Sequence, residues 1–91
     1  MREIWLNGAE MTDRETAHVY LKKKLDLPDH YGNNLDALWD CLTTDFTPRS
    51  VVLYGVEAAI ENMGAYGEAM LRVLAEAAEE NACFQLAFET G

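Results

Sequence analysis

The stretch HYGNNLDALWDCLT, residues 30–43, joins a turn, an apolar stripe and an acidic face in one short run. After the Gly-Asn-Asn turn, the apolar side chains are spaced at i, i+3, i+4 and i+7, which is typical of a helix that buries one face. These side chains are Leu35, Leu38, Trp39 and Leu42. The spacing predicts a helix over about residues 34–43.

The polar side of this predicted helix carries Asp36 and Asp40, four residues apart. Like charges at this spacing repel each other by roughly 0.2–0.5 kcal/mol on an open helix. The helix dipole favours Asp36, in the first turn, but gives Asp40 little help. No Lys or Arg occurs in residues 26–48, so no residue nearby in the sequence neutralises the pair. Residues that destabilise their own helix, as Asp36 and Asp40 do, indicate a functional site.

Length and composition predict one folded domain spanning residues 1–91, because the chain is 49% hydrophobic and large enough for a single core. The formal net charge of -9 favours basic partners over nucleic acid and anionic membranes, although solubility alone explains it equally well. No signal peptide or membrane span is evident. Cys41 and Cys83 are not in a CxxC arrangement, and we expect reduced, partly buried thiols in a cytoplasmic protein.

Short apolar runs predict three strands, at residues 3–7, 50–54 and 83–88, and Trp5 in the first of them is expected in the core. A capping box, Thr12-x-x-Glu15, opens a helix that ends before Pro28. Further helices are predicted over residues 57–63 and 68–81. The order strand, helix, helix, strand, helix, helix, strand predicts an α/β fold. It is a three-stranded parallel sheet packed against about four helices, which cover mainly one face.

Enzymatic motifs are absent: the chain contains no GxGxxG, GxxxxGK[ST], GxSxG or HExxH. His18 and His30 are not at ligand spacing from the cysteines, so neither a metal nor a cofactor is expected. Asp36 and Asp40 could serve as acid and base or bind Mg²⁺, but no third ligand or phosphate-binding loop accompanies them. We therefore expect a protein that is not an enzyme.

Other candidate residues have two interpretations on local grounds. Glu76 and Glu80 repeat the i, i+4 acidic pair near a helix C-terminus, where the dipole opposes them, yet a solvated face explains them equally well. Trp39 is more typical of a core residue than of a contact residue. His30 and Tyr31 lie in a loop beside the acidic face, so we expect them to be exposed recognition groups.

The run LPDHYGNNLDALWDCLT, residues 27–43, resembles the signature of the barstar family of intracellular ribonuclease inhibitors. The resemblance extends to residues 6–8, 21–23 and 76–83, and thus spans most of the domain. It implies the same three-stranded parallel sheet packed with helices. It also implies a surface that blocks the active site of a small secreted ribonuclease, with the second helix and the preceding loop entering a basic cleft.

The resemblance also assigns roles. Asp40 would be the central anion in place of an RNA phosphate, Asp36 would meet basic residues at the cleft edge, and Glu76 and Glu80 would make an acidic and a more peripheral contact. Three rim positions depart from the family: His30 replaces a tyrosine, Thr44 a glycine and Asp45 an aromatic, and the match needs a one-residue insertion near Asn81. The complete predicted partner-binding set is His30, Tyr31, Gly32, Asn34, Leu35, Asp36, Trp39, Asp40, Thr43, Thr44, Asp45, Glu76 and Glu80.

The leading hypothesis is therefore a bacterial, cytoplasmic immunity protein, or antitoxin. It would be a monomer when free and would bind a basic, barnase-like ribonuclease of the extracellular type one to one, without contacting nucleic acid or membrane. The alternative is an acidic binding module for another basic client, such as a nuclease toxin domain. The enzyme that would use Asp36 and Asp40 is a third and weaker hypothesis.

Overall fold

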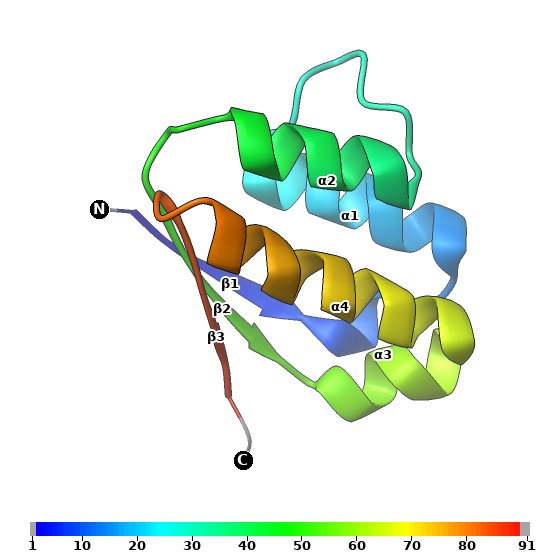
Figure 1. Ribbon diagram of the computed structural model, residues 1–91. Coiled ribbons are helices and arrows are strands. Elements are labelled where there is room, and N and C mark those ends of the chain that lie inside the picture. The colour runs from blue at the N-terminus through cyan, green and yellow to red at the C-terminus, as the bar shows by residue number, and fades with distance from the viewer. Residues whose placement is uncertain (1, 90–91) are drawn as a thin grey trace.

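The computed structural model describes residues 2–89, and in that range it contains three strands and four α-helices (Figure 1). The strands β1 (Arg2–Asn7), β2 (Arg49–Tyr54) and β3 (Phe84–Phe88) pair in parallel in the order β1-β2-β3. The helices are α1 (Arg14–Leu25), α2 (Leu35–Thr44), α3 (Val56–Met63) and α4 (Ala65–Glu80), and a 3-10 turn, η1 (Gly8–Glu10), follows β1. The predicted α/β fold is confirmed.

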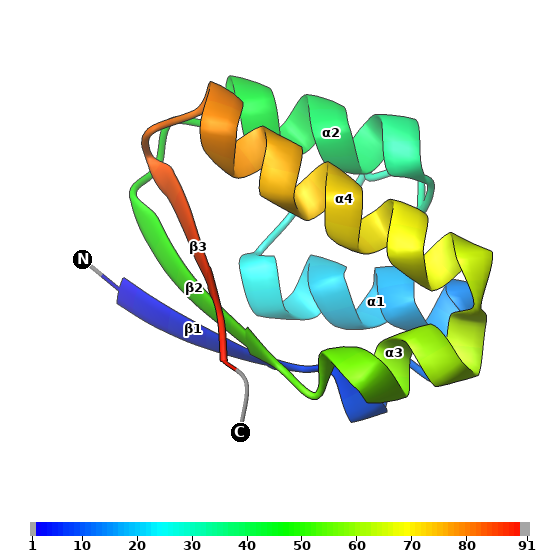
Figure 2. The same ribbon diagram turned by 60° about the horizontal axis from the view of Figure 1, so that its bottom comes forward.

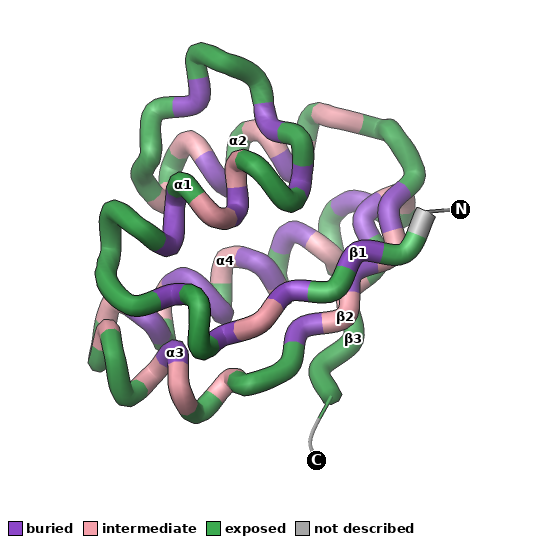
Figure 3. The backbone as a smooth tube through the Cα atoms, turned by 180° about the vertical axis from the view of Figure 1, so that it is seen from behind, coloured by how far each residue is buried: buried purple, intermediate pink, exposed green. Residues whose placement is uncertain are grey.

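Helices α1, α2 and α4 lie over one face of the sheet and leave the other uncovered (Figures 1 and 2). Side chains alternate between the two faces, so buried and more exposed positions follow each other along the strands (Figure 3). Trp5 lies between the buried Ile4 and Leu6 and thus on the uncovered face, where it is 45% exposed. Its ring meets the edge of Tyr54 at a centroid distance of 6.0 Å. The prediction of a core Trp5 is wrong, because its strand is covered on one side only.

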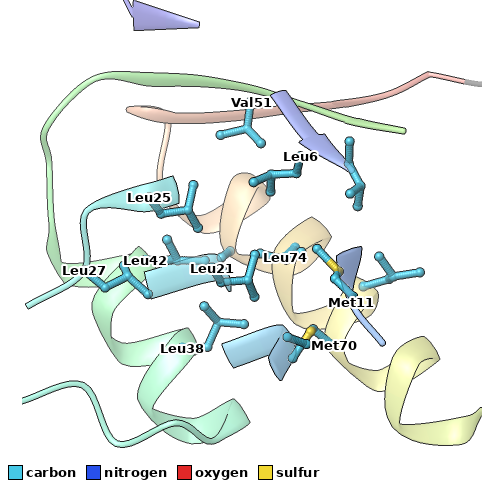
Figure 4. Packing of buried hydrophobic residues seen from close by; sticks show 14 of the residues in the cluster. Leu6, Met11, Leu21, Leu25, Leu27, Leu38, Leu42, Val51, Met70 and Leu74 are labelled. Carbon is cyan, nitrogen blue, oxygen red and sulfur yellow. The ribbon is translucent and has the colours of Figure 1, made fainter. Parts of the chain in front are cut away.

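The core fills the space between the sheet and the helices (Figure 4). Leu6 and Val51 extend from the sheet toward Leu21 on α1, while Leu38 of α2 and Leu74 of α4 close the cluster (Figure 4). All five side chains are at most 1% exposed. The apolar stripe of α2 is therefore the face that docks this helix onto the core, which turns its acidic side outward.

The starts of α1 and α4 differ from those predicted for reasons that the structure shows. Helix α1 is capped by Asp13 rather than Thr12, because the Asp13 carboxylate accepts a 2.8 Å hydrogen bond from the amide of Thr16. This bond lowers the pKa of Asp13 below its usual value. Helix α4 begins at Ala65 and continues through the buried Gly67. The backbone of α3 approaches Gly67 closely, since a β-carbon at this position would lie 2.9 Å from the carbonyl oxygen of Ala59. Gly67 is thus a close-packing position between α3 and α4 rather than a helix breaker.

A close approach of the two chain segments that follow β1 and β2 predicts the effect of Gly8→Ala. A β-carbon at Gly8 would lie 2.1 Å from the carbonyl oxygen of Gly55, an atom that cannot move without the backbone. We expect the substitution to lower the free energy of unfolding by about 1–3 kcal/mol or more, as overpacking does. Urea denaturation measures this. A loss below about 0.5 kcal/mol, the range of ordinary surface changes, would show that the two segments are not held so closely.

Candidate protein-binding face on helix α2

The start of α2 is set by two asparagines in the preceding loop. Asn33 adopts the left-handed conformation, with φ 53°. The side-chain oxygen of Asn34 accepts a 2.8 Å bond from the amide of Ala37, and its amide nitrogen donates to the carbonyl of Gly32. An asparagine N-cap of this kind satisfies an amide that the helix leaves without a partner. It fixes the start of α2 so that Asp36 lies in the first turn, exposed to solvent.

The outer side of α2 presents Asp36, Trp39 and Asp40 to solvent. Trp39 is 37% exposed, so the tryptophan lies at the border of the apolar stripe rather than fully in the core. The hydroxyl of Thr43 donates to the carbonyl of Trp39 at 2.7 Å, and that of Thr44 to the carbonyl of Asp40 at 2.6 Å. Both hydroxyl protons are therefore used within the helix, and these threonines can offer a partner only acceptor oxygens.

A shallow pocket of about 340 Å³ opens beside Asp40. Four predicted site residues line it: His30 from the loop, and Asp40, Thr44 and Asp45 from α2 and its C-terminal end. Asp26, Pro28 and Cys41 complete the lining. Of the three aspartates that line this hollow, Asp26 and Asp40 have no ion-pair partner among the described residues, so the hollow is suited to a cationic side chain.

Asp26 in this pocket was missed by sequence reasoning. It caps α1 in the left-handed conformation, with φ 56°, and the fold brings this helix end against the end of α2. The sequence feature that could have indicated Asp26 is its position directly before residues 27–43, the run that resembles the family signature.

Asp45 differs from the other acids of this face because it already has a cationic partner. Its carboxylate lies 2.8 Å from Nη2 of the buried Arg49 and accepts a 2.9 Å bond from the amide of Thr47. The Thr47 amide, and after it Arg49, lowers the pKa of Asp45. This is the one ion pair among residues 2–89, so Asp36 and Asp40 carry charges that no basic side chain of the described chain neutralises.

The loop before α2 contains one correction. Tyr31 is only 6% exposed, so the prediction that it is an exposed recognition group is wrong, whereas His30 beside it is exposed as expected. The Tyr31 ring belongs to the core cluster, and its hydroxyl lies 2.7 Å from Nδ1 of the fully buried His18. Burial raises the pKa of the Tyr31 phenol, which therefore stays protonated at any physiological pH.

The second acidic pair, Glu76 and Glu80, is exposed on α4, which packs beside α2 (Figure 2). The two helices are joined at their C-terminal ends, where the side-chain amide of Asn81 donates to the carbonyls of Leu42 and Asp45, each at 2.8 Å. Neither glutamate lines the pocket that holds Asp40. The second acidic pair therefore lies on the helix next to α2 but outside the pocket beside Asp40.

Two further features bear on the class of the protein. Within residues 2–89, no helix combines the length and apolar character that crossing a bilayer requires. In the same range, no group of three His, Cys, Asp or Glu side chains is placed as it would be around a metal ion. Cys41 and Cys83 are free and half-buried, as expected.

Comparison with known proteins gives two findings. Residues 1–89 match the family described as Barstar (barnase inhibitor). The chain is also 46% identical over 82 residues to a protein of Bacillus subtilis (strain 168) named "Putative ribonuclease inhibitor YrdF", and the match covers 88% of this chain and 89% of that protein. Both matches include the α2 face and the loop before it.

Proposed function

The chain belongs to the barstar family, which is a family of inhibitors and not of enzymes, and we propose that it inhibits a small, basic, barnase-like ribonuclease. It binds this enzyme one to one and covers the active site with the face formed by α2 and the loop before it. Asp40 occupies the place of an RNA phosphate, and Asp36 meets basic residues at the edge of the cleft. The protein acts in the cytoplasm as a monomeric immunity protein.

The observation that carries this proposal is the exposed, unneutralised pair Asp36 and Asp40 on a helix that two fully buried leucines, Leu38 and Leu42, dock onto the core. A ribonuclease cleft is built to hold the negative charge of RNA, so a rigid acidic helix matches it in charge. Arginine binds carboxylate and phosphate with the same paired hydrogen bonds, which lets an aspartate replace a phosphate group. The repulsion between Asp36 and Asp40 is relieved when basic residues of the enzyme surround them.

An inhibition assay tests the proposed function. The purified chain is added to barnase in increasing amounts, and cleavage of RNA is measured. We expect activity to fall linearly and to reach zero at an equimolar ratio. Full activity at a large excess of the chain would contradict a barnase-like target.

The salt dependence of association gives a second prediction. Exposed charges attract the enzyme over a distance set by the Debye length, which shrinks from about 30 Å at 0.01 M salt to about 8 Å at 0.15 M. The association rate constant should therefore fall by roughly tenfold or more over this range, while the dissociation rate constant changes little. Stopped-flow fluorescence of Trp39 and Trp5 measures both rates. An association rate that is independent of salt would exclude steering by the acidic face.

A different basic client is the second candidate function, and the pocket beside Asp40 favours it. His30, Thr44 and Asp45 depart from the family pattern and make this part of the rim more polar. Asp26 lies with Asp40 at the same pocket and adds a negative charge that no described basic side chain pairs with. An enzyme with an extra cationic side chain at that point, such as a nuclease toxin domain, would fit it. Capture with the immobilised chain, followed by identification of the bound protein and an assay of its nuclease activity, separates the two candidates.

A further inference from the structure

His18 joins three separate parts of the molecule through two short hydrogen bonds. Its ring nitrogens lie 2.7 Å from the hydroxyl of Tyr31, in the loop before α2, and 2.6 Å from the hydroxyl of Tyr66, on α4. His18 itself belongs to α1 and has no exposed surface. A fully buried histidine with both nitrogens engaged is thus the point at which the binding-face loop is attached to two helices of the core.

We propose that His18 is a positioning residue of the inhibitory face: in its neutral form it fixes the loop of residues 27–33 through Tyr31, and its protonation releases that loop. This inference rests on the proposed function only for its effect on ribonuclease binding. The effect on the loop itself belongs to the free protein.

The hydrogen bonds of His18 with Tyr31 and Tyr66, called the bridge below, depend on the number of protons on the imidazole ring. A neutral imidazole has one N–H donor and one acceptor nitrogen, so one tyrosine hydroxyl donates to the ring and the other accepts from it. A protonated ring donates from both nitrogens, so both hydroxyls must accept and both hydroxyl protons need acceptors elsewhere. The described residues provide no other acceptor for the hydroxyl of Tyr31 or Tyr66. Tyr66 is only partly buried, so water can accept its proton, but Tyr31 is buried, and protonation of His18 leaves the hydroxyl proton of Tyr31 without a partner, which is unfavourable.

The surroundings of the bridge do not compensate a positive charge. From α1, Arg14 places its guanidinium 4.8 Å from the ring centre of Tyr66. From the loop, α4 and α2, the titratable groups at the bridge are Tyr31, Tyr66 and Cys41. Burial raises the pKa of Tyr31 and of Cys41, so neither of these two groups supplies a negative charge at pH 7. Burial, and after it the charge of Arg14, lowers the pKa of His18 below its usual value of 6.5.

The geometry of the loop explains why this bridge affects the binding face. The main-chain bonds of the loop are local, from Leu27 to Lys22 and from Tyr31 to Pro28, and they do not reach α4. The Tyr31 side chain makes that connection through His18. On either side of Tyr31 are His30, which lines the pocket beside Asp40, and Gly32, which accepts a bond from the N-cap of α2. Movement of Tyr31 would therefore also displace its neighbours His30 and Gly32, which belong to the proposed contact surface.

The sign of the pH dependence follows from the lowered pKa. The unfolded chain takes up a proton on His18 near pH 6.5, whereas the folded chain takes it up only at lower pH. The folded state is therefore fully favoured above about pH 6.5 and loses stability as the pH falls from there through the folded-state pKa. His18→Gln should remove this part of the pH dependence, because glutamine offers one donor and one acceptor group but does not titrate in this range.

The experiment measures amide hydrogen exchange of residues 27–33 in the free protein at about pH 7.5 and about pH 5.5, corrected for intrinsic exchange. Protection of the loop should drop at the lower pH in the original protein and stay constant in His18→Gln. His30→Gln is the matched control, because His30 is the other histidine of the chain and lies exposed in the same loop. The drop in protection should persist in it. Unchanged protection in the original protein, or a drop that His18→Gln retains, would overturn the proposal.

Binding provides the functional readout. Affinity for barnase is compared at the two pH values for the original protein and His18→Gln, so that titration of the enzyme itself cancels. The pKa of His18 should be lower in the complex than in the free protein. For each unit of this difference, the affinity of the original protein should fall on the order of tenfold more than that of the variant. If loop protection behaves as expected but no barnase binds at any pH, the proposed target is wrong and His18 still positions the loop. If barnase binds with the same pH dependence in both proteins, the role of His18 in binding is refuted.

Discussion

Replacing Asp40 by alanine is expected to weaken binding to the ribonuclease by about 3–5 kcal/mol, the cost of removing one partner from a buried ion pair. This corresponds to a loss of affinity of roughly a hundredfold to a few thousandfold. The large effect arises because the arginine or other base that faces Asp40 in the complex would remain buried without a counter-charge. Isothermal titration calorimetry measures the change.

The same substitution should leave the free protein folded. Asp40 is exposed, and its main-chain carbonyl, which accepts from Thr44, is retained. Removal of its repulsion with Asp36 should raise the free energy of unfolding by roughly 0.2–0.5 kcal/mol. Binding and stability are thus expected to change in opposite directions, which a residue with only a structural role would not show.

Glu61→Ala is the matched control, since it removes the same charge from an exposed position on α3, which lies beyond α4 as seen from α2 (Figures 1 and 2). It should change affinity by less than about 1 kcal/mol, as peripheral charges do. Equal losses from Asp40→Ala and Glu61→Ala would show that only the overall charge matters. In that case the assignment of Asp40 as the central anion would be wrong.

Replacing Leu38 by alanine is expected to lower the stability of the free protein strongly. Leu38 is fully buried and holds the helix against the core (Figure 4). Leucine-to-alanine changes at such positions lower the free energy of unfolding by about 2–5 kcal/mol, through lost burial and the cavity that remains. A domain of this size unfolds with only about 5–15 kcal/mol, so the melting temperature should fall by at least about 8 °C.

Val19→Ala provides the comparison for Leu38→Ala, because Val19 is an aliphatic residue on α1 that is 55% exposed. Its effect should stay within about 0.5 kcal/mol. Urea denaturation of both variants gives the difference directly. If Leu38→Ala cost no more than Val19→Ala, α2 would not be anchored by its apolar stripe, and a rigid acidic face could not be built on it.

The sequence predicted α2 to within one residue at each end because the signals there are local. The leucine spacing marks the helix, and the asparagine turn marks its start. The parallel sheet followed from the alternation of helices and strands. In contrast, Trp5 and Tyr31 were placed wrongly, because their burial depends on which side of a strand or loop other elements cover. Such coverage is a tertiary property that neither composition nor periodicity contains.

The candidate site shows the same division. Asp36 and Asp40 could be selected from their spacing and from the absence of nearby cations, and both are exposed and unpaired in the described chain. The pocket beside Asp40 could not be predicted, because Asp26 reaches it only when the end of α1 meets the end of α2. The neutralisation of Asp45 by Arg49 likewise depends on how β2 begins next to α2. The binding role of each residue remains a prediction that the substitutions above test.

The central claim is that the acidic face occupies the active site of a ribonuclease, and competition with RNA tests it most directly. The inhibitor is mixed with barnase in the presence of RNA, and the rate at which cleavage stops is measured over a range of RNA concentrations. Occupation of the active site predicts that the apparent association rate constant falls as RNA saturates the enzyme, because RNA and the inhibitor then exclude each other. An association rate that RNA does not slow would place the chain elsewhere on the enzyme and would contradict the proposal that Asp40 replaces an RNA phosphate.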